Sequence, residues 1–457
     1  MSHRVTPQSS SAAAMPTSRR SVLKGLAVTL GATAFPAGLL TACGTSTTPS
    51  SSGSSGAGAG AGAGSVTFGS NYSDPAPKDA FAALTQAAGQ KTGTDIKINT
   101  VDHNTFQNNI NSYLQATPDA LFTWFAGYRM QFFAQQGLIE PIDDVWQKIG
   151  ANFGPAAQSL SKGLDGKFYF VPIYNYPWVV FYNKSTFKEK GYEVPTTWDD
   201  YMALLKKMKS DGLTPLAFAD KDGWPALGTF DILNLRINGY DFHIQLMKHE
   251  VPWTDPRVTQ VFTQWAEMLP YAQPGSTGRI WQDAVKTLES KKAGLMFQGT
   301  NQVAAQYVTD GKDLDDLDFF PFPAINPQFG QDYMDAPTDG FCLAKNAKED
   351  SVAPAKKVLE YLGTAEAEAT FLKTDQWDVA LANGATIPTY NDIQKKSVDV
   401  ISKCKAVSQF MDRDTDPGFA SNVMIPSIQK FINDPSTGGI KSLQDSIEAQ
   451  AKTIFTN

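Results

Sequence analysis

The apolar and polar positions after residue 64 alternate between short strand-like runs and longer stretches of helical period. Strands are predicted at residues 66–70, 95–101 and 118–124. Helices are predicted between and after them, at 78–92, 105–114 and 126–136. This order predicts an α/β fold with a mainly parallel sheet covered by helices, and it places ligand-binding groups on loops at the carboxyl ends of the strands.

The pattern changes near residue 166 and predicts a second group of elements. Prolines divide residues 166–184 into two strand-like pieces, which we interpret as the point where the chain leaves a first lobe. Further strands are predicted at 293–297, 317–322 and 339–344. Further helices are predicted at 201–210, 230–238, 256–271, 280–290, 351–373, 391–405 and 419–450, the last interrupted at 434–435. Roughly 390 residues follow residue 64 in total, more than one core usually supports, so we expect two lobes.

The amino-terminal segment predicts export and lipid attachment. Arg19 and Arg20 precede an apolar stretch that is interrupted by three glycines and a proline and ends at Ala42-Cys43. Such a stretch suits a cleavable signal better than a permanent membrane helix. The arginine pair resembles a twin-arginine translocation signal, with general secretion as the alternative, and the residues up to Cys43 resemble a lipobox. We expect a signal peptide at 1–42 and a lipid on Cys43, which would hold the protein on the extracellular face of the cytoplasmic membrane.

Residues 43–64 consist almost wholly of Ser, Thr, Gly and Ala, a composition that cannot bury a core. We interpret them as a flexible tether between the lipidated cysteine and the folded region. After the signal, the sequence contains no further uninterrupted apolar stretch of the 18–20 residues that a membrane span needs.

Charge limits the kinds of partner. Removing residues 1–42 takes away four basic and no acidic side chains, which leaves 35 basic against 46 acidic groups. An acidic surface repels polyanions, which argues against nucleic acid as a partner and against binding to anionic lipid headgroups. We therefore expect membrane attachment to come from the acyl chains alone.

Cysteines and histidines indicate neither a disulfide framework nor a metal centre. Cys342 and Cys404 remain after lipidation; one bridge between them is an alternative, but Cys342 lies in an apolar run and is interpreted as a buried thiol. His103, His243 and His249 have no zinc-ligand spacing to these cysteines. We expect no metal and no cofactor.

Short motifs follow one another along residues 65–457 in a specific order. They include Pro118-Asp119 through Trp124, residues 133–142, Val171-Pro172, Phe181-Tyr182-Asn183-Lys184, residues 195–200, residues 293–299 and residues 353–364. Together they resemble the extracellular solute-binding proteins of sugar-importing ABC transporters, in the oligosaccharide-binding class that is similar to maltose-binding protein. One departure is Asp339-Gly340-Phe341, where members often carry paired glycines.

The resemblance implies a two-lobed fold that closes on an oligosaccharide by hinge bending and delivers it to the permease subunits of an ABC importer. Lobe 1 is expected at 65–173 with 338–405, and lobe 2 at 174–337 with 406–457. Crossovers are expected near 172–174, 337–338 and 406–411. A monomer is expected.

A pyranose has an apolar face and a rim of hydroxyls, so its site needs flat aromatic side chains and planar polar groups. Loop positions of this kind give the candidates Asn71, Tyr72, Trp124, Tyr128, Tyr174, Tyr176, Trp224, Arg236, Asn301, Asp339, Phe341 and Trp377. Core or hinge packing is the alternative role for most of the aromatic candidates, and an internal ion pair is the alternative for Arg236. We expect alanine at Trp124 or Asp339 to weaken sugar binding and leave the fold intact.

Three other functions are considered. An extracellular carbohydrate-active enzyme would need two carboxyls across one cleft, and no sequence pattern singles out such a pair, so we expect no enzyme. The same fold could bind a polyamine, a glycerophosphodiester or another non-sugar solute, which a cluster of acids or of Arg and Lys around the cleft would favour. A purely structural tethered lipoprotein would not need aromatic side chains facing a cleft.

Overall fold

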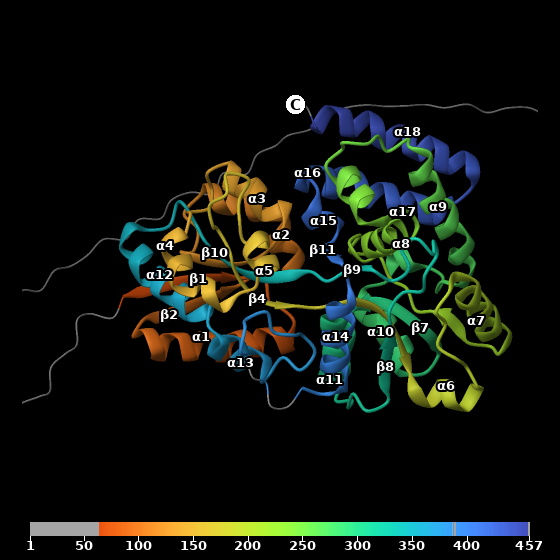
Figure 1. Ribbon diagram of the computed structural model, residues 1–457, viewed down its shortest axis with the longest axis horizontal. Helices are drawn as coiled ribbons and strands as arrows, with labels where there is room; N and C mark the ends of the chain where they lie inside the picture. Colours follow the sequence, from red (N-terminus) through yellow and green to blue (C-terminus); the bar gives the residue numbers. More distant parts are fainter. Residues whose placement is uncertain (1–63, 386, 388–389, 456–457) are drawn as a thin grey trace, which may run out of the picture. The chain divides into compact units, whose positions relative to one another are not determined.

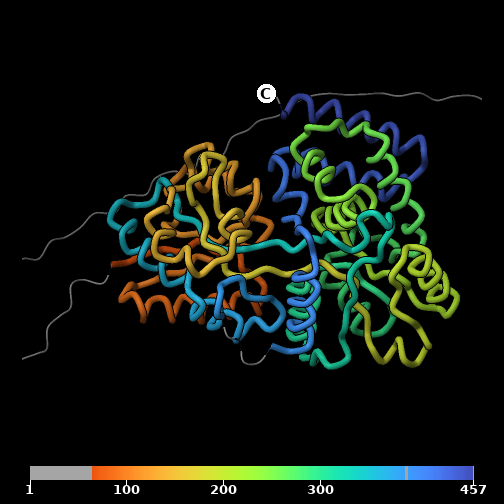
Figure 2. Tube along the Cα trace, in the orientation of Figure 1, coloured from red at the N-terminus to blue at the C-terminus, as the bar shows by residue number. Residues whose placement is uncertain are grey.

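Residues 64–385, 387 and 390–455 are described by a computed structural model (Figures 1 and 2). The predicted signal peptide, Cys43 and the tether up to residue 63 lie outside these described residues. Within the described part, no helix is both long enough and apolar enough to cross a membrane.

The first sheet has five strands in the order β2-β1-β3-β10-β4. They are β1 (Ser65–Ser70), β2 (Asp95–Thr100), β3 (Leu121–Phe125), β4 (Val171–Asn175) and β10 (Thr338–Leu343). β1 is parallel to β2 and β3, whereas β10 is antiparallel to β3 and β4. Every strand except β10 therefore runs in one direction, which confirms the predicted mainly parallel sheet.

Helices cover both faces of this sheet. They are α1 (Pro75–Thr92), α2 (His103–Gln115), α3 (Tyr128–Gln135), α4 (Asp143–Ile149), α5 (Pro155–Leu160), α12 (Glu349–Leu362) and α13 (Ala365–Leu372), with a 3-10 turn η1 (Gly150–Asn152). Figure 1 shows α1 and α13 on one side and α2 and α3 on the other. Asp102 begins α2 because its carboxylate accepts the N–H of Thr105 at 2.9 Å, and this places His103 in the first helical turn.

The second sheet has four strands in the order β6-β7-β5-β8. They are β5 (Trp178–Asn183), β6 (Thr214–Leu216), β7 (Ala293–Gly299) and β8 (Leu317–Phe320). β5 is antiparallel to β7 and β8, and β6 is parallel to β7, so β5 alone runs against the others.

The remaining helices surround the second sheet or follow it in the chain. They are α6 (Lys184–Lys190), α7 (Trp198–Ser210), α8 (Pro225–Met247), α9 (Pro256–Met268), α10 (Trp281–Glu289), α11 (Thr300–Thr309), α14 (Asp392–Lys403), α15 (Met411–Asp414), α16 (Pro417–Phe419), α17 (Ile425–Asn433) and α18 (Thr437–Ile454). Shorter turns are η2 (Leu269–Tyr271), η3 (Ser276–Gly278) and the π-helical η4 (Ala420–Met424). Helix α8 is broken at Gly239, whose φ of 80° favours glycine.

Three segments connect the two sheets. β4 leads into β5 through residues 176–177, and β9 (Tyr333–Asp335) leads into β10 through residues 336–337. Figure 2 shows these two segments, in yellow and cyan, side by side, as expected from the pairing of β4 with β10. The third connection joins α13 beside the first sheet to α14, which follows it in the chain. β11 (Ala406–Ser408) pairs in parallel with β9, so the segment near 406–411, which the sequence suggested as a crossover, lies beside the β9–β10 connection and is separate from the connection between α13 and α14.

Helix α14 packs with the second sheet. Its Ile393 and Val400 belong to one apolar cluster with Phe181 of β5 and Phe319 of β8. Lys396 of α14 also pairs with Asp318 of β8 at 2.7 Å. We therefore propose that the first lobe ends within residues 373–391, earlier than the boundary at 405 that the sequence suggested.

The two cysteines of the described region are free thiols. Cys342 is buried, and this burial raises the pKa of its thiol well above the ordinary value. The interpretation of Cys342 as a buried thiol is confirmed.

Candidate functional site

A cleft lies between loops of the first sheet and helix starts around the second sheet. Asn71 and His103 follow β1 and β2 at the carboxyl ends of these parallel strands, where ligand groups were predicted. Trp224, Trp281 and Asn301 stand at the starts of α8, α10 and α11. The cleft has about 720 Å³ of empty space, including its open mouth.

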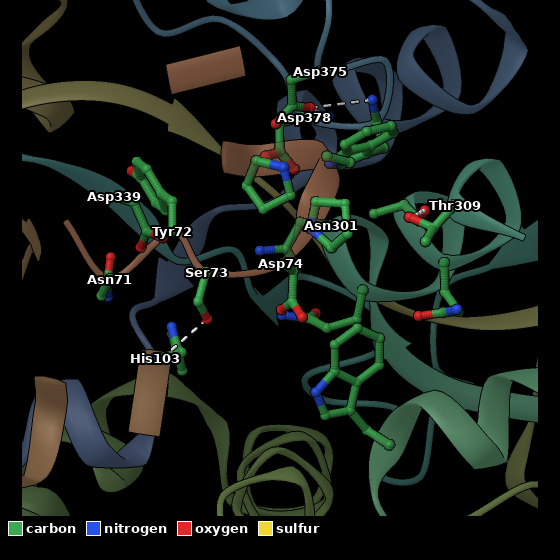
Figure 3. A pocket seen from close by; sticks show the side chains of 18 of the residues that line it. Asn71, Tyr72, Ser73, Asp74, His103, Asn301, Thr309, Asp339, Asp375 and Asp378 are labelled. Carbon is green, nitrogen blue, oxygen red and sulfur yellow. Dashed lines mark hydrogen bonds between the residues drawn. The ribbon is translucent and has the colours of Figure 1, made fainter. Parts of the chain in front are cut away.

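A smaller cavity of about 420 Å³ continues this cleft. Both spaces are bounded by His103, Trp224, Asn301, Gln302 and Asp339. The two cavities are therefore treated as one site. Figure 3 shows Asn71, Tyr72 and Asp339 on one side of the larger cavity, Asn301 and Thr309 on the other, and Asp375 and Asp378 together at a third edge.

A buried hydrogen-bond network holds Asp339 at the centre of the cleft wall. Arg413 of α15 donates to Asp339 Oδ1 at 2.6 Å, and the Tyr174 hydroxyl donates to Asp339 Oδ2 at 3.0 Å. Arg413 also donates to the Tyr176 hydroxyl at 2.9 Å, and its guanidinium lies 4.0 Å from the centre of the Phe125 ring. Burial raises the pKa of Asp339, and the charge of Arg413 offsets part of that rise. The network fixes a carboxylate and two tyrosines from different elements in one geometry.

Aromatic side chains form much of the remaining lining. Trp224 is partly exposed, and its ring meets Trp178 edge to face at a centroid distance of 6.3 Å. Trp281 and Trp377 are buried with one part at the cavity surface. Flat apolar rings beside carboxylates and amides are the combination that a sugar site requires.

Several buried polar atoms of the lining have no hydrogen-bond partner within the protein. Asn71 shows how one is positioned: its side-chain oxygen accepts from Thr123 at 2.8 Å, and its backbone N–H donates to the same hydroxyl at 2.9 Å. The amide nitrogen of Asn71 is left without an acceptor. The others are the Tyr72 hydroxyl, Trp178 Nε1, Asn301 Oδ1, Gln302 Oε1, Asp375 Oδ2, Asp378 Oδ1 and Asp412 Oδ1. Buried polar groups are normally paired, so these atoms indicate a ligand or solvent rich in donors and acceptors.

His103 is neutral over the physiological pH range. Burial and the nearby charge of Arg413 lower its pKa to about 4. Its backbone N–H donates to the Ser73 hydroxyl at 3.1 Å, as the dashed line in Figure 3 marks, and its ring contacts the Gln107 amide at 2.6 Å. It can therefore offer a ligand a neutral imidazole edge but no positive charge.

The structure brings eight of the twelve sequence candidates to this cleft. They are Asn71, Tyr72, Tyr174, Tyr176, Trp224, Asn301, Asp339 and Trp377. The other four, Trp124, Tyr128, Arg236 and Phe341, are absent from the lining of both cavities.

Packing explains the positions of three of these four. Trp124 has no exposed surface and belongs to a cluster with Phe106 of α2 and Phe133 of α3. Phe341 lies two residues further along β10 than Asp339, a rise of roughly 6.6 Å, and packs on Phe68. Arg236 donates to main-chain carbonyls instead of an acid, including that of Phe322 at 2.9 Å.

The sequence reasoning missed several lining residues. Asp375 and Asp378 flank Trp377 in the same polar turn, so the rule that selected the tryptophan could also have found them. No local sequence pattern pointed to Arg413 as a site residue, because its partner Asp339 is 74 residues away in the sequence. The starts of helices α10 and α2 supply Trp281 and His103, which were not selected either. In the described residues, no group of three or more His, Cys, Asp or Glu could hold a metal ion.

Comparisons with known proteins point in one direction. The family described as "Bacterial extracellular solute-binding protein" matches residues 72–369. A Pyrococcus horikoshii protein, named as an uncharacterised ABC transporter extracellular-binding protein, is 27% identical over 293 residues, which cover 63% of this chain and 64% of that protein. An alpha-glucosides-binding periplasmic protein of Rhizobium meliloti is 25% identical over 63% of this chain and 65% of its own length. The alignments thus span about two thirds of these relatives.

Solved structures extend the comparison to nearly all of the folded region. The bacterial solute receptor AcbH, whose structure is reported with an exclusive substrate preference for β-D-galactopyranose, is 69% identical. Its alignment covers 86% of this chain and 100% of that one, with a TM-score of 0.84. A chitin oligosaccharide-binding protein has the same fold at 21% identity and a TM-score of 0.74.

Proposed function

Because the chain belongs to the bacterial extracellular solute-binding proteins, we propose that it captures a sugar in the cleft and delivers it to the membrane subunits of an ABC importer. The observation that best supports sugar binding is that tryptophans line the same cleft as buried amide and carboxyl groups that have no hydrogen-bond partner. These groups come from loops of the first sheet and from helix starts around the second sheet. A ligand touching both sides would favour closure about the three connecting segments.

We infer that the ligand is a galactopyranose, a single sugar, although the sequence suggested an oligosaccharide. The inference is supported by the 69% identity to AcbH over its whole length. The buried ion pair of Arg413 and Asp339 also stands in the wall of the smaller cavity, and Asp339 lines the larger one as well.

Thermal unfolding of residues 65–457 with and without candidate ligands tests this function. A ligand that binds only the folded state stabilises it by about 2.7 kcal/mol at a hundred times its Kd. We expect D-galactose to raise the melting temperature, and D-glucose, a di- to tetrasaccharide panel and glycerophosphodiesters to have little effect. A shift only with an oligosaccharide would contradict the monosaccharide assignment, and no shift with any sugar would contradict sugar binding.

A cationic solute such as a polyamine is the second candidate. Acidic side chains outnumber basic ones in the combined lining, which contains Asp74, Asp339, Asp375, Asp378 and Asp412 but, apart from the neutral His103, only Arg413 as a basic residue. Spermidine therefore belongs in the same unfolding screen. A shift with spermidine and none with sugars would favour this candidate.

We propose binding without catalysis. The relatives are named as binding proteins, one as an ABC transporter extracellular-binding protein and one as an alpha-glucosides-binding periplasmic protein. Incubation of residues 65–457 with p-nitrophenyl galactosides and oligosaccharides is expected to release no product.

Trp224→Ala is expected to weaken D-galactose binding by about tenfold or more and to leave the fold intact. Trp224 is partly exposed at the start of α8 and lines both cavities, so its removal takes away a contact surface for the sugar without opening a core cavity. Isothermal titration calorimetry measures the affinity. Tyr128→Ala is the matched control, because Tyr128 is also an aromatic residue at a helix start but lies outside the cleft lining. Equal affinities of the two variants would contradict the assignment of Trp224.

We propose export by the twin-arginine route and a lipid on Cys43, in the segment that precedes the described residues. Cys43→Ala is expected to move the full-length protein from the membrane to the soluble fraction and to leave sugar affinity unchanged. Fractionation of cells expressing either form measures the distribution. Firm membrane retention of the variant would contradict the lipid anchor.

A further inference from the structure

Two buried carboxyl groups stand side by side at one edge of the cleft. Asp375 and Asp378 are each 1% exposed and lie in the segment that follows α13. Asp375 Oδ1 accepts the N–H groups of Trp377 at 3.4 Å and of Asp378 at 3.1 Å, which fixes the turn (Figure 3). Asp375 Oδ2 and Asp378 Oδ1 have no donor in the protein, although the two carboxyl groups are within hydrogen-bond contact of each other.

Such a contact requires a proton. Ionised carboxylates only accept hydrogen bonds, so two of them cannot bond to each other, whereas an acid and a carboxylate can. Two negative charges in neighbouring buried positions also repel each other. The pair is therefore stable in this position when it holds one proton in common.

The surroundings strengthen this effect. Burial raises the pKa of Asp375 to about 7, and burial together with Asp375 raises the pKa of Asp378 well above its ordinary value. The titratable or charged groups that face the pair from neighbouring elements are Asp339 on β10, Tyr72 after β1, Tyr174 and Tyr176 at β4, and Tyr390 before α14. Glu368 of α13 supports the same segment by accepting the N–H groups of Leu381 and Ala382. Arg413 is engaged with Asp339 and does not neutralise the pair.

We propose that Asp375 and Asp378 bind sugar hydroxyls as a carboxylic acid–carboxylate pair that shares one proton, and that the sugar complex holds this proton more tightly than the free protein does. The proposal rests on the sugar-binding function proposed above. A hydroxyl can accept from the acid and donate to the carboxylate, so the pair matches both of its roles. Asn71, whose buried amide nitrogen has no acceptor, offers a further donor in the same cavity. Closure around a sugar removes water and disfavours the doubly charged pair further.

The sign of the pH effect follows from linkage. A site that holds its proton more tightly in the complex takes up protons on binding. Affinity is then highest below the pKa of the free pair and falls as the pH rises through it, by at most about tenfold for each pH unit. His103 is neutral throughout this range because its pKa is lowered to about 4, so it does not produce the effect.

Calorimetric titration of the folded protein with D-galactose, from pH 6 to 9 and in two buffers of different ionisation heat, tests the proposal. We expect proton uptake of up to one per sugar near pH 8, and an affinity at pH 9 that is lower by about tenfold or more than at pH 6. Asp378→Asn removes the proton but keeps the shape, so it is expected to bind with neither proton uptake nor pH dependence. Glu289→Gln is the control, because burial raises the pKa of Glu289 to about 7 but Glu289 lies outside the cleft lining.

The outcomes separate this proposal from the proposed function. Absence of sugar binding at every pH would contradict the function itself. Normal binding without proton uptake would overturn the shared proton and leave the function standing. Asp375→Asn is the second variant: if both asparagine variants unfold like the wild type but bind no sugar, the pair acts by its charge and the proposal fails.

Discussion

Arg413→Met is expected to lower the free energy of unfolding of residues 65–457 by about 3–5 kcal/mol. The guanidinium lies 2.6 Å from Asp339 Oδ1, and both side chains are nearly fully buried. Methionine removes the partner and leaves a buried carboxylate whose charge nothing nearby compensates. It also removes the hydrogen bond to the Tyr176 hydroxyl. Urea unfolding followed by tryptophan fluorescence measures the difference.

The double variant Arg413→Met with Asp339→Asn provides the control. It removes both charges, so we expect it to recover at least half of the lost stability. This expectation revises the sequence-based one that alanine at Asp339 would leave the fold intact, because Asp339 is part of a buried ion pair. A double variant no more stable than Arg413→Met alone would show that packing of Arg413 on Phe125, and not charge compensation, accounts for the loss.

Trp124→Ala is expected to destabilise the protein by about 3–5 kcal/mol, the range for a large aromatic side chain lost from a core. The side chain has no exposed surface and touches several rings, among them Phe125 and Phe133 at centroid distances of 4.9 and 5.8 Å. The guanidinium of Arg129 also lies 5.2 Å from its ring. Alanine leaves a cavity that these neighbours cannot fill. The free energy of unfolding again comes from urea denaturation.

The sugar affinity of the folded fraction shows whether Trp124 acts in the core or in the cleft. We expect the affinity of Trp124→Ala for D-galactose to stay within about threefold of the wild type at a temperature where the variant is folded. Trp224→Ala is the matched comparison, since it should keep its stability and lose affinity for D-galactose. A variant of Trp124 that is stable but binds weakly would restore the sequence-based assignment of this residue to the site.

The alternating pattern was enough to predict most elements of the first sheet. The strand predicted at residues 66–70 and the helix predicted at 78–92 correspond to β1 and α1. Short elements escaped prediction, among them β6, β9 and β11 with three residues each. Such strands have too few positions to show a period, and only pairing with a distant strand defines them.

The residues of the site also divide into those that the sequence predicts and those that only packing places. Residues next to a predicted strand end or crossover, such as Asn71 and Tyr174, were found because their chain neighbours mark the loop. Trp124 also stands near the end of a strand, but every residue of this strand is buried, and the Trp124 ring packs among aromatic side chains of α2 and α3 instead of lining the cleft.

The sequence alone determined the family resemblance, the α/β class, the two-lobed plan and the choice of flat aromatic residues beside polar turns. These properties depend on local periodicity and on which residues are neighbours in the chain. Only the tertiary structure decided that Arg413 meets Asp339, that Trp124 is core and that Asp375 and Asp378 share one wall of the cleft. Which face a side chain occupies and which distant charge it meets depend on packing between elements far apart in the chain, and no local pattern records that packing.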